Sequence, residues 1–290
     1  MNESRRAFLS AAGAVGGALA LAGCAGDDPQ DVEAGAVTTT TRTESSTPTS
    51  TASGGDLKPT VATSTIRAGT EQETTVYEIR SGRPGPTAFV VGGMHGNEES
   101  GYWAADDVRN WKIDAGTLVV LPEANAPAVE QHRREWPGEM DLNRQFPIGA
   151  PPKNALAREI WGAIRRHEPD VLVDLHSSKG ILRRENDEGV GQNVFHSNHE
   201  SVVRSVQRAI EYLNDEFVTG YEPIYDFVRT PADDSEYATA PMLVNKARRD
   251  RDIPSCLFEV TQDGVKPEKR ARWTKAFVAS VLDSWRIRAL

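Results

Sequence analysis

A histidine and a glutamate stand three positions apart in the stretch TAFVVGGMHGNEESG, at His95 and Glu98, just after an apolar run that ends in two glycines. A second histidine, His176, closes another apolar run, DVLVDLH. Two imidazoles and a carboxylate suit a catalytic zinc ion, which takes three protein ligands and leaves one position for water. The pattern therefore predicts one Zn²⁺ per chain, with His95 and Glu98 on one loop and His176 at the end of a neighbouring strand.

Further polar residues could complete a hydrolytic site. Glu259 lies within the apolar run SCLFEVTQDG, where burying a carboxylate is costly unless it is paired or has a task. Beside a zinc ion it could take a proton from the attacking water and pass it to a leaving amine. Arg144, next to Asn143 in MDLNRQFP, has a planar guanidinium that can hold a substrate carboxylate bidentately. These residue types predict hydrolysis of an amide bond beside a carboxylate.

The elements that must position these residues alternate along the chain. Apolar or alternating runs predict strands at residues 74–80, 87–93, 117–123, 170–176 and 255–260. Helical patterns lie at residues 98–111, 155–167, 202–213 and 266–285. Such alternation predicts an α/β fold whose sheet carries helices on both faces. In sheets of this kind the working residues sit at the strand ends, which is where the candidates fall.

The amino-terminal segment predicts export. Residues 1–24 have a charged start, a short apolar stretch and a small-residue ending, which is typical of a signal. The pair Arg5 and Arg6 resembles a twin-arginine signal, and LAGC resembles a lipoprotein processing box that makes Cys24 the lipidated residue. We expect an exported protein on the extracellular face of the cell membrane, held by a lipid on Cys24. An ordinary secreted protein that discards Cys24 is the alternative.

Composition separates a tether from a folded body. Residues 25–56 are rich in Thr, Ser, Gly and acid and are predicted to be a disordered tether, and residues 57–290 are predicted to form one zinc-hydrolase domain. Removal of residues 1–24 takes two Arg and one Glu from 33 basic and 42 acidic residues, which leaves 31 and 41. A chain this acidic is a poor partner for nucleic acid. No protein partner is evident, and Cys256 is expected to be a buried apolar residue.

The motifs HGNE, DLNR, DLH and FEVTQDG, in that order, resemble the zinc carboxypeptidase superfamily and its succinylglutamate desuccinylase and aspartoacylase branch. The resemblance runs from about Phe89 to Gly264. It implies a mixed, mostly parallel β-sheet between helices, a single zinc ion and cleavage of an amide bond beside a carboxylate. It also implies that His95, Glu98 and His176 are the metal ligands and that Glu259 is the general base.

The resemblance assigns roles to further residues. Asn143 and Arg144 would clamp the substrate carboxylate. An arginine that polarises the substrate carbonyl would be Arg134 or, one residue earlier, Arg133, and the spacing from Asn125 favours Arg134. The carboxypeptidase branch also has a mobile tyrosine, which would correspond to Tyr237 in DDSEYATAP.

Several alternatives remain open at this point. The substrate could be a small peptide or an N-acyl amino acid. A tethered binding protein that keeps the metal without turnover is a rival hypothesis, although a receptor has no need of a base such as Glu259. A serine hydrolase has little support, because Ser177 and Ser178 lie beside His176 without a G-x-S-x-G motif. Lys179, Arg183 and Arg184 could bind an acidic substrate or form a solvated patch, and His196 and His199 could line the pocket.

Overall fold

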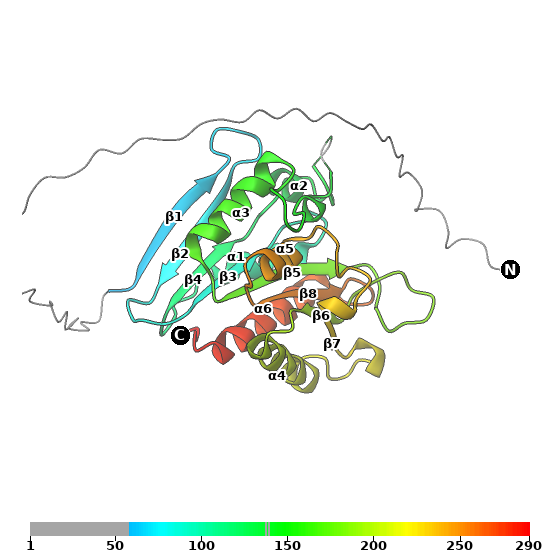
Figure 1. The fold of residues 1–290 in the computed structure, drawn as a ribbon. Helices are drawn as coiled ribbons and strands as arrows, with labels where there is room; N and C mark the ends of the chain where they lie inside the picture. Colours follow the sequence, from blue (N-terminus) through cyan, green and yellow to red (C-terminus); the bar gives the residue numbers. More distant parts are fainter. Residues whose placement is uncertain (1–57, 137, 139) are drawn as a thin grey trace, which may run out of the picture. The chain divides into compact units, whose positions relative to one another are not determined.

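The computed structural model describes residues 58–136, 138 and 140–290 of the chain (Figure 1). The predicted signal, the lipidated Cys24 and the predicted tether lie outside these residues. The described part contains an eight-stranded sheet with the order β1-β2-β4-β3-β5-β8-β6-β7. The strands are β1 (Thr60–Ile66), β2 (Thr74–Arg80), β3 (Thr87–Val91), β4 (Thr117–Leu121), β5 (Val171–Ser178), β6 (Asn193–His196), β7 (Val228–Pro231) and β8 (Ser255–Thr261).

The centre of the sheet is parallel and its flanks are mixed. The strands β4, β3, β5 and β8 run in one direction, and β6 and β7 form a parallel pair in which β6 is antiparallel to β8. The hairpin of β1 and β2 is antiparallel and joins the sheet through β4. The central strands consist largely of Val, Leu, Phe and Ala that are buried on both faces, which is the pattern of strands covered by helices on each side.

Helices cover both faces of the sheet (Figure 1). The helices are α1 (Glu99–Val108), α2 (Ala126–Glu130), α3 (Ala155–His167), α4 (Glu200–Glu216), α5 (Leu243–Asp250) and α6 (Pro267–Ser284). The apolar sides of α1, α4 and α6 pack in one cluster on one face, and those of α3 and α5 pack in another cluster on the opposite face. Apolar burial on both faces supplies the main driving force for this arrangement.

The predicted fold class, an α/β fold with a mixed, mostly parallel sheet flanked by helices, is confirmed. The predicted strand at residues 87–93 is too long, because β3 ends at Val91 and Gly93 takes a positive φ of 66° that turns the chain. The predicted helix at residues 98–111 is also too long, since α1 starts after Glu98 and ends at Val108. Within the described residues, no helix is long and apolar enough to cross a membrane.

Candidate active site

The loop after β3 brings His95 and Glu98 to the carboxyl end of the parallel strands. Gly93 makes the turn, and Gly96 lets the loop lie directly against α2, since a Cβ there would be 1.9 Å from the carbonyl oxygen of Ala128. Glu98 then occupies the N-cap position of α1, and its backbone carbonyl accepts from the amide of Gly101. The glycines of the sequence motif therefore allow a tight loop whose two polar side chains turn inward.

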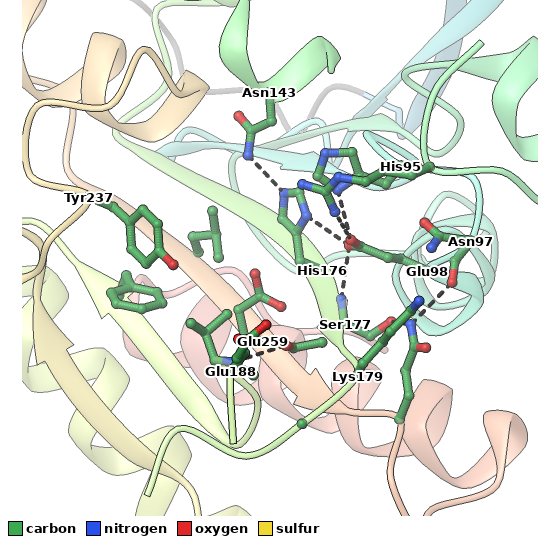
Figure 2. Close-up of a pocket in the computed structure, with 18 of the residues that line it drawn as sticks. His95, Asn97, Glu98, Asn143, His176, Ser177, Lys179, Glu188, Tyr237 and Glu259 are labelled. Atoms are coloured by element: carbon green, nitrogen blue, oxygen red, sulfur yellow. Dashed lines mark hydrogen bonds and ion pairs between the residues drawn. The ribbon is translucent and has the colours of Figure 1, made fainter. Parts of the chain in front are cut away.

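Figure 2 shows the imidazoles of His95 and His176 next to the Glu98 carboxylate, with dashed lines joining both to it. His95 Nδ1 lies 2.8 Å from Glu98 Oε1, and His176 Nδ1 lies 2.8 Å from Glu98 Oε2. The backbone amide of Ser177 also donates to Oε2, at 3.0 Å. All three side chains are buried, and one ligand atom from each lies within 4.8 Å of the other two. The set of two nitrogens and one oxygen matches a catalytic zinc site in donor type and number.

The Glu98 carboxylate stabilises the charged forms of both imidazoles, and they stabilise its own. Burial disfavours the Glu98 carboxylate, but the positive charges of His95 and His176 outweigh burial and hold the pKa of Glu98 well below its usual value. Burial likewise opposes the imidazolium of His176, but the charges of Asp174 and Glu98 raise its pKa well above the usual value. Such coupling marks a strongly polar site inside an apolar protein.

Two aspartates that the sequence analysis did not single out face the outer nitrogens of the imidazoles. Asp141 Oδ1 lies 2.9 Å from His95 Nε2, and Asp174 Oδ2 lies 3.2 Å from His176 Nε2. Carboxylates in this position fix the tautomer and orientation of metal-binding histidines. Asp174 was recognisable from its spacing, because residues two apart on a strand point to the same face and a buried carboxylate in VLVDLH needs a partner.

Glu259 lies on β8, where its Cα pairs with that of His176 on β5. The residue as a whole is half-buried, but its Oε2 atom is buried and has no hydrogen-bond partner among the described residues. Burial raises the pKa of Glu259 to about 8, and the charge of Glu98 adds to the effect while that of His176 opposes it. Glu259 thus lies beside the cluster of His95, Glu98 and His176 and forms no hydrogen bond with Glu98, which is a suitable position for a proton-transfer group.

The structure brings the remaining predicted residues into the same cavity, which has a volume of about 590 Å³. Arg134 lines it and donates to Glu98 Oε1 at 3.2 Å and to Asp141 Oδ2 at 2.8 Å, whereas Arg133 is not among the lining residues. Asn143, Arg144 and Tyr237 also line the cavity, as do His95, Glu98, His176 and Glu259. All eight residues predicted for the site thus share one pocket, while their roles stay predictions.

The side-chain amide of Asn143 is held by a hydrogen bond to the backbone. Its Oδ1 accepts from the backbone amide of Leu243 at 3.0 Å, and its Nδ2 points toward His176 Nε2 at 3.4 Å (Figure 2). Arg144 donates to the carbonyl of Asn143 at 3.1 Å, and Asp141 caps this turn by accepting from the amide of Asn143 at 2.8 Å. The short 3₁₀ turn at Leu142–Arg144 therefore aims both side chains of the predicted clamp at the cavity.

The other basic residues considered from the sequence divide into two groups. Lys179 lines the cavity, whereas Arg183 donates to backbone carbonyls such as that of Pro223, and Arg184 pairs with Asp263. His196 and His199 lie at the end of β6 and at the N-cap of α4, and neither is among the residues that line the cavity.

Residues 84–186 match the family model described as the succinylglutamate desuccinylase/aspartoacylase catalytic domain. This part of the chain is therefore similar to the catalytic domain of the succinylglutamate desuccinylases and aspartoacylases. This relationship confirms the resemblance predicted from the ordered motifs. The matched residues include His95, Glu98, Arg134, Arg144 and His176, and Glu259 lies beyond them.

Curated relatives match over a similar length of the chain. An N-alpha-acetyl-L-2,4-diaminobutyric acid deacetylase from Halomonas elongata is 34% identical over 111 residues, which cover 34% of this chain and 30% of that protein. A probable aspartoacylase from Parasynechococcus marenigrum is 31% identical over 105 residues, which cover 32% of this chain and 34% of that protein. The matched part thus spans about a third of each relative's length.

Solved structures share the fold at low sequence identity. The product-bound cell shape determinant protein Csd4 from Helicobacter pylori gives a TM-score of 0.62 at 16% identity and covers 80% of this chain and 56% of that one. A succinylglutamate desuccinylase/aspartoacylase from Rhodobacter sphaeroides gives a TM-score of 0.56 at 18% identity, covering 79% and 66%. At these identities the likeness shows the fold alone.

Proposed function

We propose that this protein is a zinc-dependent hydrolase that cleaves an amide bond next to a carboxylate. One observation carries the proposal: His95, Glu98 and His176 form a buried cluster of potential metal ligands, and Glu259 stands beside it in the same cavity. The named activities of the relatives, deacetylase and aspartoacylase, support the same class of reaction.

The residues present fit a zinc ion. His95 and His176 would offer their Nδ1 atoms together with a Glu98 oxygen, since the Nε2 atoms of both imidazoles already face aspartates. Three ligands of this type leave room for a substrate or water. A zinc ion held there would act as a Lewis acid and make water more acidic.

Glu259 would serve as the general base and acid. Its carboxylate lines the cavity beside His176 and has no ion pair within the described part of the chain that would hold it. In the reaction it would take a proton from the attacking water as the new C–O bond forms. It would then deliver that proton to the leaving nitrogen as the C–N bond breaks, so that an amine and a carboxylic acid are released.

Arg144, Asn143 and Arg134 would orient the substrate. The Arg144 guanidinium can hold a carboxylate bidentately. If the proton on His176 Nε2 faces Asp174, the Nδ2 of Asn143 cannot donate to that nitrogen and is available for a substrate oxygen. Arg134 lies beside Glu98, where its charge would stabilise the oxyanion of the carbonyl under attack. Tyr237 would close the substrate side of the cavity.

The substrate would be an N-acyl amino acid or a small peptide with a free carboxylate. The first is the class named for the Halomonas elongata deacetylase, and the second is consistent with the description of Helicobacter pylori Csd4 as a D,L-carboxypeptidase. A binding protein that carries the metal without turnover is the second candidate. The presence of Glu259 in the cavity favours the enzyme, because carboxylate binding alone does not call for an unpaired acid there.

We also propose that the protein works outside the cell, held at the membrane surface by a lipid on Cys24. This proposal rests on the LAGC stretch and the paired arginines of the sequence. Cys24→Ser should release the protein from the membrane fraction or leave it mislocalised, because no lipid can then be attached. Fractionation checks this, and wild-type protein found wholly in the medium would count against the anchor.

The experiment for the proposed activity is an amine-release screen with purified, zinc-loaded protein on N-acyl amino acids and blocked peptides. Glu259→Gln, which is nearly the same size and is not a proposed metal ligand, should keep the zinc and lose about 10²- to 10⁴-fold in turnover. Turnover at the wild-type rate in this variant would exclude the mechanism. A wild type that binds these compounds and never cleaves any would favour the receptor.

A further inference from the structure

Two buried polar atoms without partners belong to residues on adjacent strands. Glu259 Oε2 on β8 accepts no hydrogen bond, and Asn193 Nδ2 on β6 donates to nothing, as far as the described residues go. Asn193 is fully buried, with no exposed surface. A buried amide donor and a buried carboxylate oxygen that both lack partners are each costly, and a hydrogen bond between the two would remove both costs.

The register of the sheet places these residues face to face. Asn193 and Glu259 are directly opposite in the antiparallel pair of β6 and β8, and Phe195 lies opposite Leu257 two residues along. Opposite residues point to the same face of a sheet with their Cβ atoms about 4.5–5.5 Å apart. Phe195, Leu257 and Glu259 all line the cavity, so this face is the one that bounds it. Side chains at opposite positions of this kind are close enough to interact with each other.

The orientation of the Asn193 amide is already fixed. Its Oδ1 accepts a hydrogen bond from Thr230 Oγ1 at 3.0 Å, so its Nδ2 is directed away from Thr230. The start of β6 is held as well, because Gln192, the residue before β6, accepts through its Oε1 from the backbone amide of Thr261 on β8, at 3.0 Å. The guanidinium of Arg134, which also lines the cavity, is already bonded to Glu98 and Asp141. Asn193 is therefore a neutral donor well placed for Glu259 Oε2.

We propose that Asn193 is a positioning residue for Glu259. Its Nδ2–H donates to Oε2 of the ionised carboxylate, which leaves the other carboxylate oxygen to face the attacking water. The bond fixes the plane of the carboxylate without placing a charge beside it, so it lowers the basicity of Glu259 less than a cationic partner would. This inference rests on the proposed function, in which Glu259 is the base, and adds the residue that holds that base in place.

The test compares kcat, KM and zinc content in two variants. Asn193→Leu keeps the approximate shape and removes the donor, and it should lower kcat by up to about 100-fold while KM and zinc content stay unchanged. Thr230→Val removes the hydroxyl that orients the amide and should lower kcat by a smaller factor. Asn214→Leu is the control for lost packing, because Asn214 bonds the backbone of Phe227 away from the cavity. This control should leave kcat unchanged. Should Asn193→Leu fail to fold, Thr230→Val decides the question.

A double-mutant comparison separates this inference from the proposed function. In the Glu259→Gln background, Asn193→Leu should cause no further loss of kcat, because no base remains to be positioned. Loss of turnover in Glu259→Gln together with a wild-type kcat in Asn193→Leu overturns the positioning role alone. An additional loss in the double variant, or a raised KM with normal kcat, also overturns it. Wild-type turnover in Glu259→Gln overturns the proposed function instead.

The free energy of unfolding in urea tests the hydrogen bond without any turnover. It is measured for the wild type, Asn193→Leu, Glu259→Gln and the double variant. The stability cost of Asn193→Leu should be larger in the wild-type background than in the Glu259→Gln background. The reason is that a hydrogen bond to a charged carboxylate is stronger than one to a neutral amide. Equal costs in the two backgrounds would overturn the hydrogen bond.

Discussion

Gly96→Ala should disrupt the metal site without touching any proposed ligand. A Cβ at residue 96 would lie 1.9 Å from the carbonyl oxygen of Ala128, and real Cβ atoms do not approach other atoms within 3.0 Å. The loop that carries His95 and Glu98 must therefore move by roughly 1 Å away from α2, at an overpacking cost of about 1–3 kcal/mol. Metal–ligand distances tolerate only about 0.2 Å, so zinc affinity should fall sharply.

The assay is zinc affinity measured by competition with a chromophoric chelator, together with thermal unfolding. Gly162→Ala is the matched control, because its Cβ would meet only the tip of Arg166, at 3.4 Å, and alanine stabilises a helix interior by about 0.5–1 kcal/mol relative to glycine. The control should bind zinc normally and melt slightly higher. Wild-type zinc affinity in Gly96→Ala would refute the account of why the loop contains this glycine.

Two further substitutions probe the surroundings of the site. Asp174→Asn should weaken zinc binding about 10- to 100-fold, because the residue facing His176 Nε2 no longer carries a charge, and chelator competition measures this. Unchanged affinity would remove Asp174 from the site. Arg144→Lys should raise KM about 10-fold for substrates with a free carboxylate, because a point charge replaces a bidentate fork. Esters or amides of that carboxylate should be hydrolysed equally by both proteins, and an equal loss for blocked and unblocked substrates would contradict the clamp.

Long apolar runs made the central strands predictable from the sequence. The runs at β3, β4, β5 and β8 are buried on both faces and contain few polar residues, so their positions stand out. The edge strand β1 and the short strands β6 and β7 were not predicted as strands of the sheet. The sequence of β1, TVATSTI, is exposed at all positions except Ile66, so burial leaves little pattern in it, and β6 and β7 are each only four residues long.

The candidate site was predictable where a polar residue interrupts an apolar run. His176 and Glu259 stand out in this way, and the short spacing of His95 and Glu98 singles out their loop. The contacts of Asp141 and Asn193 were not predictable, because they depend on which strands and turns become neighbours. Register across β6 and β8 is a property of the folded sheet, and no local pattern in the sequence around Asn193 encodes the position opposite Glu259.

The most direct test of the central claim is the zinc content of the purified protein, measured by elemental analysis in the wild type and in His176→Ala. The account predicts about one zinc per wild-type chain and loss of most of it in the variant, because removal of one of three ligands opens the site. Full retention of zinc by folded His176→Ala, or a wild-type chain that binds no zinc when it is supplied, would contradict the claim.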